Sequence, residues 1–510
     1  MEGILLEYKL VEQNSEKLDK ARKYVKDNMM KVINQPHRNN YHVMPEVGWL
    51  NDPNGFSFYK EEYHLFYQYY PYATYWGPMH WGHVKSKDLI KWEYLPVALA
   101  PDQKYDANGC FSGSAIQVHA KHILMYTGHV DPKMSFTGTS ASEVGEVRQV
   151  QCLAVGDGIN YHKLVHNPII STEMIPTNSS LSDFRDPKIW EKNGMYYCVI
   201  GCRDSDESGK IAMYRSANLV DWVFVGILDH SQHKLGRMWE CPDVFELDQR
   251  DVLIMSPQEL HDEGFRYKNG NSTVFFIGKL DYETGKFDKV SFDEVDYGLD
   301  FYAPQTTLAP DGRRIMIAWM QSWDRNIPSA QYGWSGSMTL PRELKVINNR
   351  IYQIPVKEIE NYRHNEISYK DIPISKSIQL DGINGRCLEL EMTVDFTQAS
   401  QFSLKLMKNK VCETIISFDK ETSILKFDRS QSQSGINEAS PKDMREVPVL
   451  LNNSQLKLRI FIDTYSVEIF AQDGQYTMTS TVYSDLDARE IEFAAQGEVM
   501  VSVSKWDLQV

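Results

Sequence analysis

The sequence predicts an all-β protein: a five-bladed β-propeller followed by a C-terminal β-sandwich, with a short N-terminal helix. Three observations support this fold class. Similar runs of aliphatic and aromatic residues recur at regular intervals over the first two thirds of the chain. The last third alternates polar and apolar residues, as half-buried strands do. One stretch near the start carries apolar residues at helical spacing.

The helix is predicted over residues 15–32, within an N-terminal extension of residues 1–35. Ser15 provides a capping side chain at its start. Leu18, Ala21 and Val25, followed by Met29, fall on one face at helical spacing. We interpret the segment as an accessory helix packed on the main domain; a helix that binds a partner is the alternative.

The propeller is predicted over residues 36–345. Runs of similar composition begin every 57 to 73 residues, which leaves room for about four strands and their loops in each unit. A second repeat supports this unit, because residues 86–92 resemble residues 216–222, about two units further along. The five runs span residues 63–68, 122–126, 195–200, 252–255 and 314–319.

The remainder reads as a linker over residues 346–365 and a β-sandwich over residues 366–510. Residues 388–394 and 456–462 alternate strictly between polar and apolar side chains. Asp473 and Gly474 mark a tight turn between two further strands. We see no cluster of candidate catalytic acids in this part, so we expect its role to be structural or ancillary.

Bulk properties narrow the class of protein. The 510 residues exceed what one ordinary core can organise, so two or more domains are expected. A net charge of -15 argues against nucleic acid or an anionic membrane as the main partner. No apolar run approaches the length of a membrane span, and the first residues lack the pattern of a secretory signal. The seven scattered cysteines are typical of reduced thiols, so we expect a cytoplasmic protein.

Three acidic residues stand out because each lies in a turn-forming run beside aromatic residues. Asp52 lies in Trp-Leu-Asn-Asp-Pro-Asn-Gly, Asp186 in Phe-Arg-Asp-Pro, and Glu240 in Trp-Glu-Cys-Pro-Asp. A stiff turn next to aromatic side chains fixes both the position and the pKa of an acid. Cleavage of a glycosidic bond needs a proton donor and a carboxylate. The three acids therefore suggest chemistry on a sugar.

Their immediate neighbours suggest different roles. Asp52 follows Asn51, whose amide can help to keep a nearby carboxylate ionised. Asp186 follows Arg185, whose guanidinium favours the charged form of the acid. Glu240 has a less polar setting, between tryptophan and cysteine, that could raise its pKa. These settings favour Asp52 as nucleophile, Asp186 as a fixed anionic clamp and Glu240 as acid and base.

Several blocks of the sequence resemble the signature blocks of glycoside hydrolase family 32, in that family's order and rough spacing. The resemblance covers roughly residues 36 to 505. It implies a five-bladed propeller followed by a sandwich, a retaining double displacement, no cofactor and no catalytic metal. The matching blocks are residues 49–55, 111–115, 184–187, 240–243, 300–305 and 463–470, together with Trp319.

The resemblance also implies roles for individual residues. Asp52 would attack the anomeric carbon of a β-fructofuranosyl unit, and Glu240 would protonate the leaving oxygen and then act as base. Asp186 would bind fructosyl hydroxyls and stabilise the transition state. The residues that match the family's sugar-binding wall, and that could instead serve strand and core packing, are Asn51, Gln68, Trp76, Phe111, Ser112, Arg185, Tyr302 and Trp319.

Within the family, residues 76–83 and the N-terminal helix look most like the bacterial sucrose-6-phosphate hydrolases. The expected partner is therefore a small sugar: sucrose 6-phosphate, sucrose or a short β-fructoside. His80 and His83 have a spacing seen in metal sites, but no clear third ligand joins them. Cys241, beside Glu240, predicts sensitivity to thiol reagents. Four basic residues flank the motifs and could reach a phosphate or be plain surface charges: Arg203, Arg237, Arg266 and Lys268.

Other functions remain open at this stage. An intracellular fructan or fructo-oligosaccharide hydrolase is a close alternative, and a fructosyl transferase would use the same acids. A propeller that binds sugar without catalysis is an alternative of a different class, although the presence of all three acids argues against it. The sequence leaves the oligomeric state open between a monomer and a homodimer.

Overall fold

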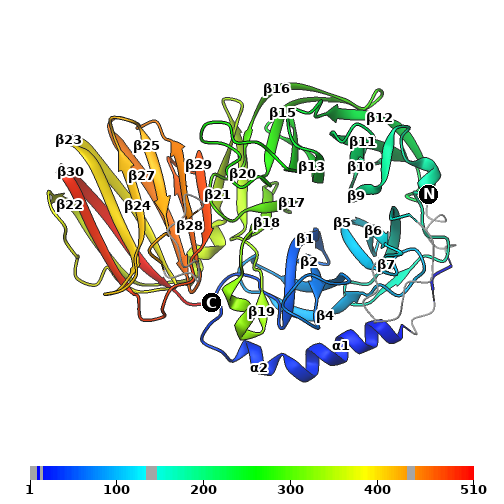
Figure 1. Ribbon diagram of the computed structural model, residues 1–510, viewed down its shortest axis with the longest axis horizontal. Helices are drawn as coiled ribbons and strands as arrows, with labels where there is room; N and C mark the ends of the chain where they lie inside the picture. Colours follow the sequence, from blue (N-terminus) through cyan, green and yellow to red (C-terminus); the bar gives the residue numbers. More distant parts are fainter. Residues whose placement is uncertain (1–8, 12–14, 134–145, 433–442) are drawn as a thin grey trace.

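The computed structural model describes residues 9–11, 15–133, 146–432 and 443–510. Within these residues, five β-sheets surround a central axis, and a second β domain lies beside them (Figure 1). The predicted fold class, a five-bladed propeller followed by a sandwich, is confirmed. In this part of the chain no helix is long and apolar enough to cross a membrane.

Each blade is an antiparallel sheet that starts at the propeller axis, where the first strands of neighbouring blades contact one another. The first blade has β1 (Gly48–Tyr59), β2 (Glu62–Tyr70), β3 (His80–Ser86) and β4 (Glu93–Leu99). The second has β5 (Gly109–Val118), β6 (Lys121–Val130), β7 (Arg148–Gly156) and β8 (Tyr161–Lys163), followed by the short 3-10 helix η1 (Thr172–Met174). The third has β9 (Ser179–Lys192), β10 (Met195–Asp204), β11 (Gly209–Ser216) and β12 (Trp222–His230).

The last two blades follow the same plan. The fourth has β13 (Met238–Leu247), β14 (Arg250–Gln258), β15 (Val274–Asp281) and β16 (Lys286–Glu294). The fifth has β17 (Tyr302–Leu308), β18 (Arg314–Trp319), β20 (Arg342–Ile347) and β21 (Arg350–Pro355). Between β18 and β20, the chain passes through η2 (Pro328–Tyr332) and returns to the first blade. There β19 (Trp334–Ser335) pairs in parallel with the start of β1, which joins the last blade to the first.

The five runs that predicted the repeat all form the second strand of a blade: β2, β6, β10, β14 and β18. These strands are buried over most of their length because neighbouring blades cover both faces. The two similar segments at 86–92 and 216–222 are equivalent turns in the first and third blades. Asp88 and Asn218 each accept hydrogen bonds from the backbone N–H groups two and three residues further on.

The fifth blade is longer than predicted. Strands β20 and β21 pair from Arg342 to Pro355, so the propeller continues about ten residues beyond the expected boundary at 345. The short strand β21 reads Arg-Ile-Tyr-Gln-Ile-Pro and lacks the regular alternation of polar and apolar residues that marks a half-buried strand. The true connection is the 3-10 helix η3 (Lys357–Tyr362), and the second domain starts directly after it.

The second domain packs two β layers around its own apolar core. The long strands β23 (Leu388–Lys408) and β30 (Glu490–Leu508) pair with each other and pass between the layers at bulges. One layer adds β24 (Thr414–Asp419), β25 (Ile424–Asp428) and β26 (Met444–Pro448). The other adds β22 (Arg363–Ile374), β27 (Gln455–Asp463), β28 (Ser466–Ala471) and β29 (Tyr476–Thr481). Asp473 and Gly474 lie in the tight turn between β28 and β29, as predicted.

A buried ionic cluster joins the two domains. His42 contacts Asp463 through Nδ1 at 2.7 Å and Glu468 through Nε2 at 2.8 Å. Arg342 of the fifth blade donates to Glu468 at 2.5 Å and to Asp296 at 3.0 Å. The two carboxylates raise the pKa of His42 to about 9, against the opposing effect of its burial. Because these charges are removed from water, His42 and Arg342 of the propeller depend on the carboxylates of the second domain, and those carboxylates depend on them.

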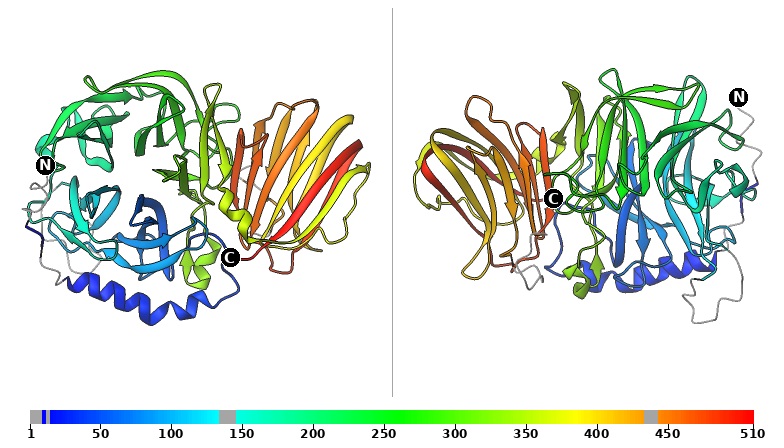
Figure 2. Two further views of the ribbon diagram at one scale, coloured as in Figure 1. Left: turned by 180° about the vertical axis from the view of Figure 1, so that it is seen from behind. Right: turned by 45° about the horizontal axis from the view of Figure 1, so that its top comes forward.

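The predicted N-terminal helix is α1 (Glu16–Asn28), continued by α2 (Met30–Ile33). The Ser15 hydroxyl accepts a hydrogen bond from the backbone N–H of Leu18 and so caps the helix. Leu18, Ala21 and Val25 are buried, whereas Met29 is only partly buried. Both views in Figure 2 show the helix along the outer side of the first blade. Arg22 donates to the carbonyl of Val97 there, so the helix is an accessory element of the propeller.

Candidate active site

The functional side chains lie where the five innermost strands of the propeller lose their regular pairing. Each of these strands carries a bulge, which re-aims side chains toward the axis. The bulges fall between Leu50 and Pro53, Phe111 and Gly113, Arg185 and Lys188, Glu240 and Asp243, and Tyr302 and Gln305.

The three predicted acids are therefore in strands and not in turns. Asp52 lies in β1, Asp186 in β9 and Glu240 in β13, on the first, third and fourth blades. Asp186 itself has a φ of 67°, and Cys241, next to Glu240, has a φ of 48°. Such left-handed backbone is uncommon for these residue types and accompanies the bulges. The Pro and Gly residues of the motifs mark irregular strands here.

Asp52 presents one free carboxylate oxygen. Its Oδ2 accepts a hydrogen bond from the Ser112 hydroxyl at 2.9 Å and lies 3.7 Å from the Cys241 thiol. Its Oδ1 is buried and has no hydrogen-bond partner among the described residues. Burial, together with the nearby charge of Glu240, raises the pKa of Asp52 to about 6. The free oxygen is thus available to a substrate atom.

Asp186 is buried and held mainly by backbone groups. Its Oδ2 accepts a hydrogen bond from the backbone N–H of Cys241 at 3.0 Å, and its own N–H donates to Thr127. Burial raises the pKa of Asp186 to about 7; Arg185 opposes this rise, and the charges of Glu240 and Asp52 add to it. Asp186 and Asp52 both lie within 4 Å of the Cys241 sulfur, so the two carboxylates are close neighbours.

Glu240 lies in a polar setting, and the less polar setting predicted from its sequence neighbours is wrong. Its Oε1 accepts from Arg185 at 2.9 Å. Its Oε2 accepts from the Tyr302 hydroxyl at 2.6 Å and from the Gln258 amide at 2.8 Å. Trp239 points away, into the core between blades. The side chains that surround Glu240 come from other blades and from β14, which local sequence does not reveal.

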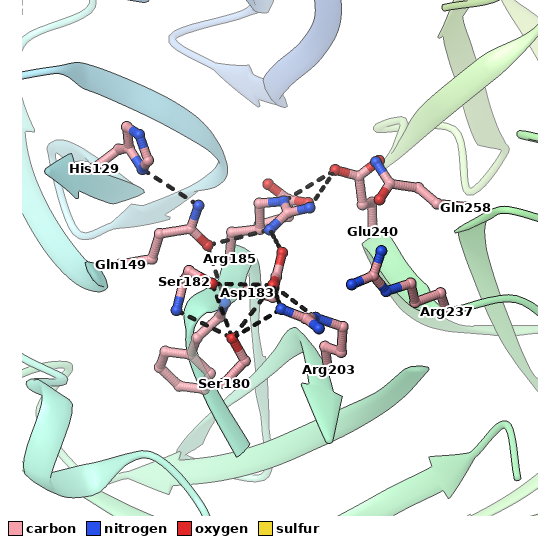
Figure 3. A network of polar contacts seen from close by, with 12 residues as sticks. His129, Gln149, Ser180, Ser182, Asp183, Arg185, Arg203, Arg237, Glu240 and Gln258 are labelled. Carbon is pink, nitrogen blue, oxygen red and sulfur yellow. Dashed lines mark hydrogen bonds and ion pairs between the residues drawn. The ribbon is translucent and has the colours of Figure 1, made fainter. Parts of the chain in front are cut away.

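Arg185 connects Glu240 to a larger polar network (Figure 3). Its guanidinium also donates to Asp183 at 2.8 Å and to Gln149 at 3.3 Å. Burial alone would lower the pKa of Arg185, but the carboxylates of Glu240 and Asp183 outweigh it and raise the pKa. Arg185 therefore holds Glu240 directly. Its charge also favours the ionised form of the adjacent Asp186, as predicted.

Most of the other predicted binding residues surround the same three acids. Ser112 and Tyr302 contact Asp52 and Glu240 directly, as described above. The Asn51 amide oxygen accepts a hydrogen bond from the Trp49 indole at 2.8 Å. The Trp319 indole packs edge-on against Trp49, and its N–H is buried with no hydrogen-bond partner among the described residues.

The remaining predicted residues form an aromatic and amide wall on the first two blades. Trp76 is partly buried and packs edge-on against Phe111, which in turn stacks on His129 with ring centres 4.1 Å apart. The Gln68 amide donates to the carbonyl of Cys110 at 3.1 Å. These contacts serve packing, and Trp76 keeps an accessible surface for a ligand.

Some functional residues were not predicted. Asp183, Gln149 and Gln258 hold the Arg185–Glu240 pair. Trp323 packs against Trp319, and its indole N–H also has no hydrogen-bond partner in the part of the chain that the structure describes. Asp183 had a usable signal, because residues two apart on a strand share a face and its charge is opposite to that of Arg185. Gln149 and Gln258 had none, because they lie on other strands, β7 and β14, and no local pattern links them to Arg185 or Glu240.

The predicted basic residues separate into two groups. Arg203 belongs to the network shown in Figure 3 through Asp183, and Arg237 lies beside that network and pairs with Glu207 and Glu259. Arg266 pairs with Glu263 and Asp293, and Lys268 pairs with Asp262, all outside that network. His80 and His83 do not face a common metal position. His83 contacts His64, and His80 contacts the carbonyl of Pro78.

Comparison with known proteins identifies the family. The model of the glycosyl hydrolases family 32 N-terminal domain matches residues 42–355, and that of the family's C-terminal domain matches residues 358–509. The chain belongs to glycoside hydrolase family 32. The family's two domains meet where β21 ends, in agreement with the observed end of the fifth blade.

Family 32 relatives resemble this chain over nearly its whole length. A sucrose-6-phosphate hydrolase of Zymomonas mobilis is 40% identical over 489 residues, covering 92% of each chain. One from Escherichia coli is 36% identical and covers 91% of this chain and 93% of its own. A family 32 β-fructofuranosidase of Bombyx mori superimposes with a TM-score of 0.83 at 35% identity, covering 98% of this chain and 99% of its own. The sucrose-6-phosphate hydrolase of Lactobacillus gasseri gives the same TM-score at 30% identity, covering 98% of both chains.

Proposed function

We propose that this family 32 enzyme is a retaining β-fructofuranosidase that hydrolyses sucrose 6-phosphate and sucrose. The observation that carries the proposal is the pairing of Asp52, which has one free buried oxygen, with Glu240, which is held by three donors on the neighbouring side of the site. A carboxylate free to attack and an acid positioned beside it are the two groups that a retaining glycosidase requires.

In the first step, Oδ1 of Asp52 attacks the anomeric carbon of the fructosyl unit. The bond from that carbon to the glycosidic oxygen breaks, and the Glu240 carboxyl gives its proton to the departing oxygen. The products of this step are a fructosyl ester on Asp52 and the free glucosyl product. Ser112 steadies the other Asp52 oxygen, so that the free oxygen keeps its direction of attack.

In the second step, water attacks the same carbon. Glu240, now a carboxylate, takes a proton from that water, and the ester bond to Asp52 breaks to release fructose. The contacts from Arg185, Tyr302 and Gln258 keep Glu240 in one position through both steps. Asp186 accepts hydrogen bonds from fructosyl hydroxyls in this scheme, since its position on the backbone N–H of Cys241 is fixed.

Two features support the choice of substrate. Relatives named sucrose-6-phosphate hydrolases match the chain at 36 to 40% identity. A sucrose complex is known for the Bombyx mori neighbour. The seven cysteines are all free thiols. We accordingly also propose a cytoplasmic location, where thiols stay reduced, and cell fractionation would test it.

The experiment compares kcat/KM on sucrose 6-phosphate, sucrose and kestose, with Asp52→Ala as the blank. We expect turnover of the first two substrates, with at least about a 10³-fold loss in the blank. Methanol added as a competing acceptor should give methyl β-fructofuranoside, which shows retention of configuration. Preferred hydrolysis of kestose would favour an oligofructoside hydrolase, and dominant transfer products would favour a transferase. Binding of these sugars without turnover would contradict the proposal as a whole.

A further inference from the structure

Two arginines beside the active site converge on a single oxygen atom. Nη2 of Arg237 lies 2.7 Å from Oε1 of Glu207, and Nη1 of Arg203 lies 3.2 Å from the same oxygen. Figure 3 shows both guanidinium groups on one side of the Arg185–Glu240 pair. Two guanidinium groups that share one acceptor define a position suited to an anion with several oxygens.

The Arg203 guanidinium is anchored by a partly buried partner, whereas the Arg237 guanidinium bridges two exposed carboxylates, Glu207 at 2.7 Å and Glu259 at 3.3 Å. Arg203 donates through Nε to Asp183 at 2.8 Å, and Asp183 is itself held by Arg185. The backbone of Arg237 is fixed by a hydrogen bond from its N–H to the carbonyl of Gln258. The Glu207 side chain is 61% exposed and extends from a turn residue with a φ of 66°. Exposed ion pairs of this kind are weak, so a stronger anion can replace the carboxylate.

The two arginines lie at a distance from Glu240 that suits a substituent on the leaving sugar. Arg237 lies directly before β13 and precedes Glu240 by three residues, about 10 Å between their Cα atoms if the chain is extended there. Gln258 contacts both residues: its side-chain amide donates to Glu240, and its carbonyl accepts from the backbone N–H of Arg237. A hexose whose glycosidic oxygen meets Glu240 extends about one ring length from it. A substituent on the primary hydroxyl of this hexose then lies beside Arg237.

We propose that Arg203 and Arg237 bind the phosphate ester of the leaving sugar, and that Glu207 occupies this position until the phosphate displaces it. The inference rests on the proposed function, because it requires a phosphorylated sugar at the same active site. A phosphate dianion has three terminal oxygens for the N–H groups that Glu207 releases, and it carries twice the charge of the carboxylate. Arg203 and Arg237 therefore determine the preference for phosphorylated over free sucrose.

The test measures kcat/KM for sucrose 6-phosphate and for sucrose and follows their ratio. Arg237→Gln is expected to lower this ratio by about tenfold to a hundredfold, the usual effect of losing a hydrogen bond to a charged group. Inhibition by the product glucose 6-phosphate should weaken by a similar factor, with glucose as the uncharged comparison. The matched control is Arg215→Gln, since Arg215 is 42% exposed against 40% for Arg237 and also pairs with a surface glutamate. It should leave the ratio unchanged.

Glu207→Ala gives a test of opposite sign. Removing the competing carboxylate should raise the ratio by about threefold or more, because the phosphate no longer has to displace it. If Glu207→Ala leaves the ratio of the two kcat/KM values unchanged or lowers it, the phosphate does not displace Glu207. If the parent enzyme prefers sucrose 6-phosphate but Arg237→Gln keeps its ratio, the phosphate site is wrong while the proposed function stands. If the parent shows no preference, the phosphorylated substrate itself is wrong, and the site is refuted with it.

Discussion

Replacing Asp52 with asparagine is expected to abolish turnover and, at neutral pH, to make the folded protein more stable. The side chain keeps its shape, and Ser112 can still donate to the oxygen that replaces Oδ2. The change removes a charge that burial and the nearby Glu240 make unfavourable. A catalytic carboxylate kept in such a place lowers the stability of the fold, a cost that is common at active sites.

The size of the effect follows from the pKa. A rise from 3.8 to about 6 corresponds to about 3 kcal/mol of preference for the neutral form in the folded state. The folded protein binds this proton more tightly than the unfolded chain does. Stability is therefore lost as pH rises from about 4 to about 6, and the loss persists above that range. Asp52→Asn should recover most of it at neutral pH and nothing below about pH 4.

The assay is thermal unfolding of the parent and of Asp52→Asn at several pH values. A chain of 510 residues that unfolds as one unit has an unfolding entropy near 1 kcal/mol per kelvin, so about 3 kcal/mol raises Tm by about 3 °C. Asp473→Asn, on the exposed turn between β28 and β29, is the control and should show no such change. If Asp52→Asn is no more stable than the parent at about pH 7.5, the Asp52 carboxylate is not strained by its surroundings, and our reasoning is refuted.

Three further outcomes are expected. The value of kcat/KM for sucrose should fall as pH drops through about 6, because protonation removes the attacking carboxylate of Asp52; a rate that stays flat to about pH 4.5 would contradict this. Glu240→Gln should lower kcat by about 10³-fold, whereas Glu246→Gln, further along the same strand and exposed, should not, and equal effects would remove Glu240 from the chemistry. Arg342→Met should lower the free energy of unfolding by about 3 to 5 kcal/mol, since it leaves the buried Glu468 without its arginine; urea titration measures this, and a neutral result would show that the cluster does not hold the domains together.

The repeat of the propeller could be predicted from sequence because its physical cause is local. The second strand of each blade is covered on both faces, so β2, β6, β10, β14 and β18 must be apolar at nearly every position. The helix was equally clear, since the spacing of its buried residues follows from helix geometry alone. The end of the fifth blade was missed because β21 is a short outer strand without a regular alternation of polar and apolar residues, so its sequence resembles that of a connection.

The sequence by itself indicated the three acids that the structure brings together, since each lies in a contiguous motif that resembles a family 32 block. Only the tertiary structure decided what surrounds each acid. Tyr302 and Arg185 reach Glu240 from the fifth and third blades, and Gln258 reaches it from the adjacent strand. A blade is a local unit, but the axis of a propeller is where all five blades meet. The contacts that orient a catalytic group there join residues far apart in the chain, and no local pattern encodes them.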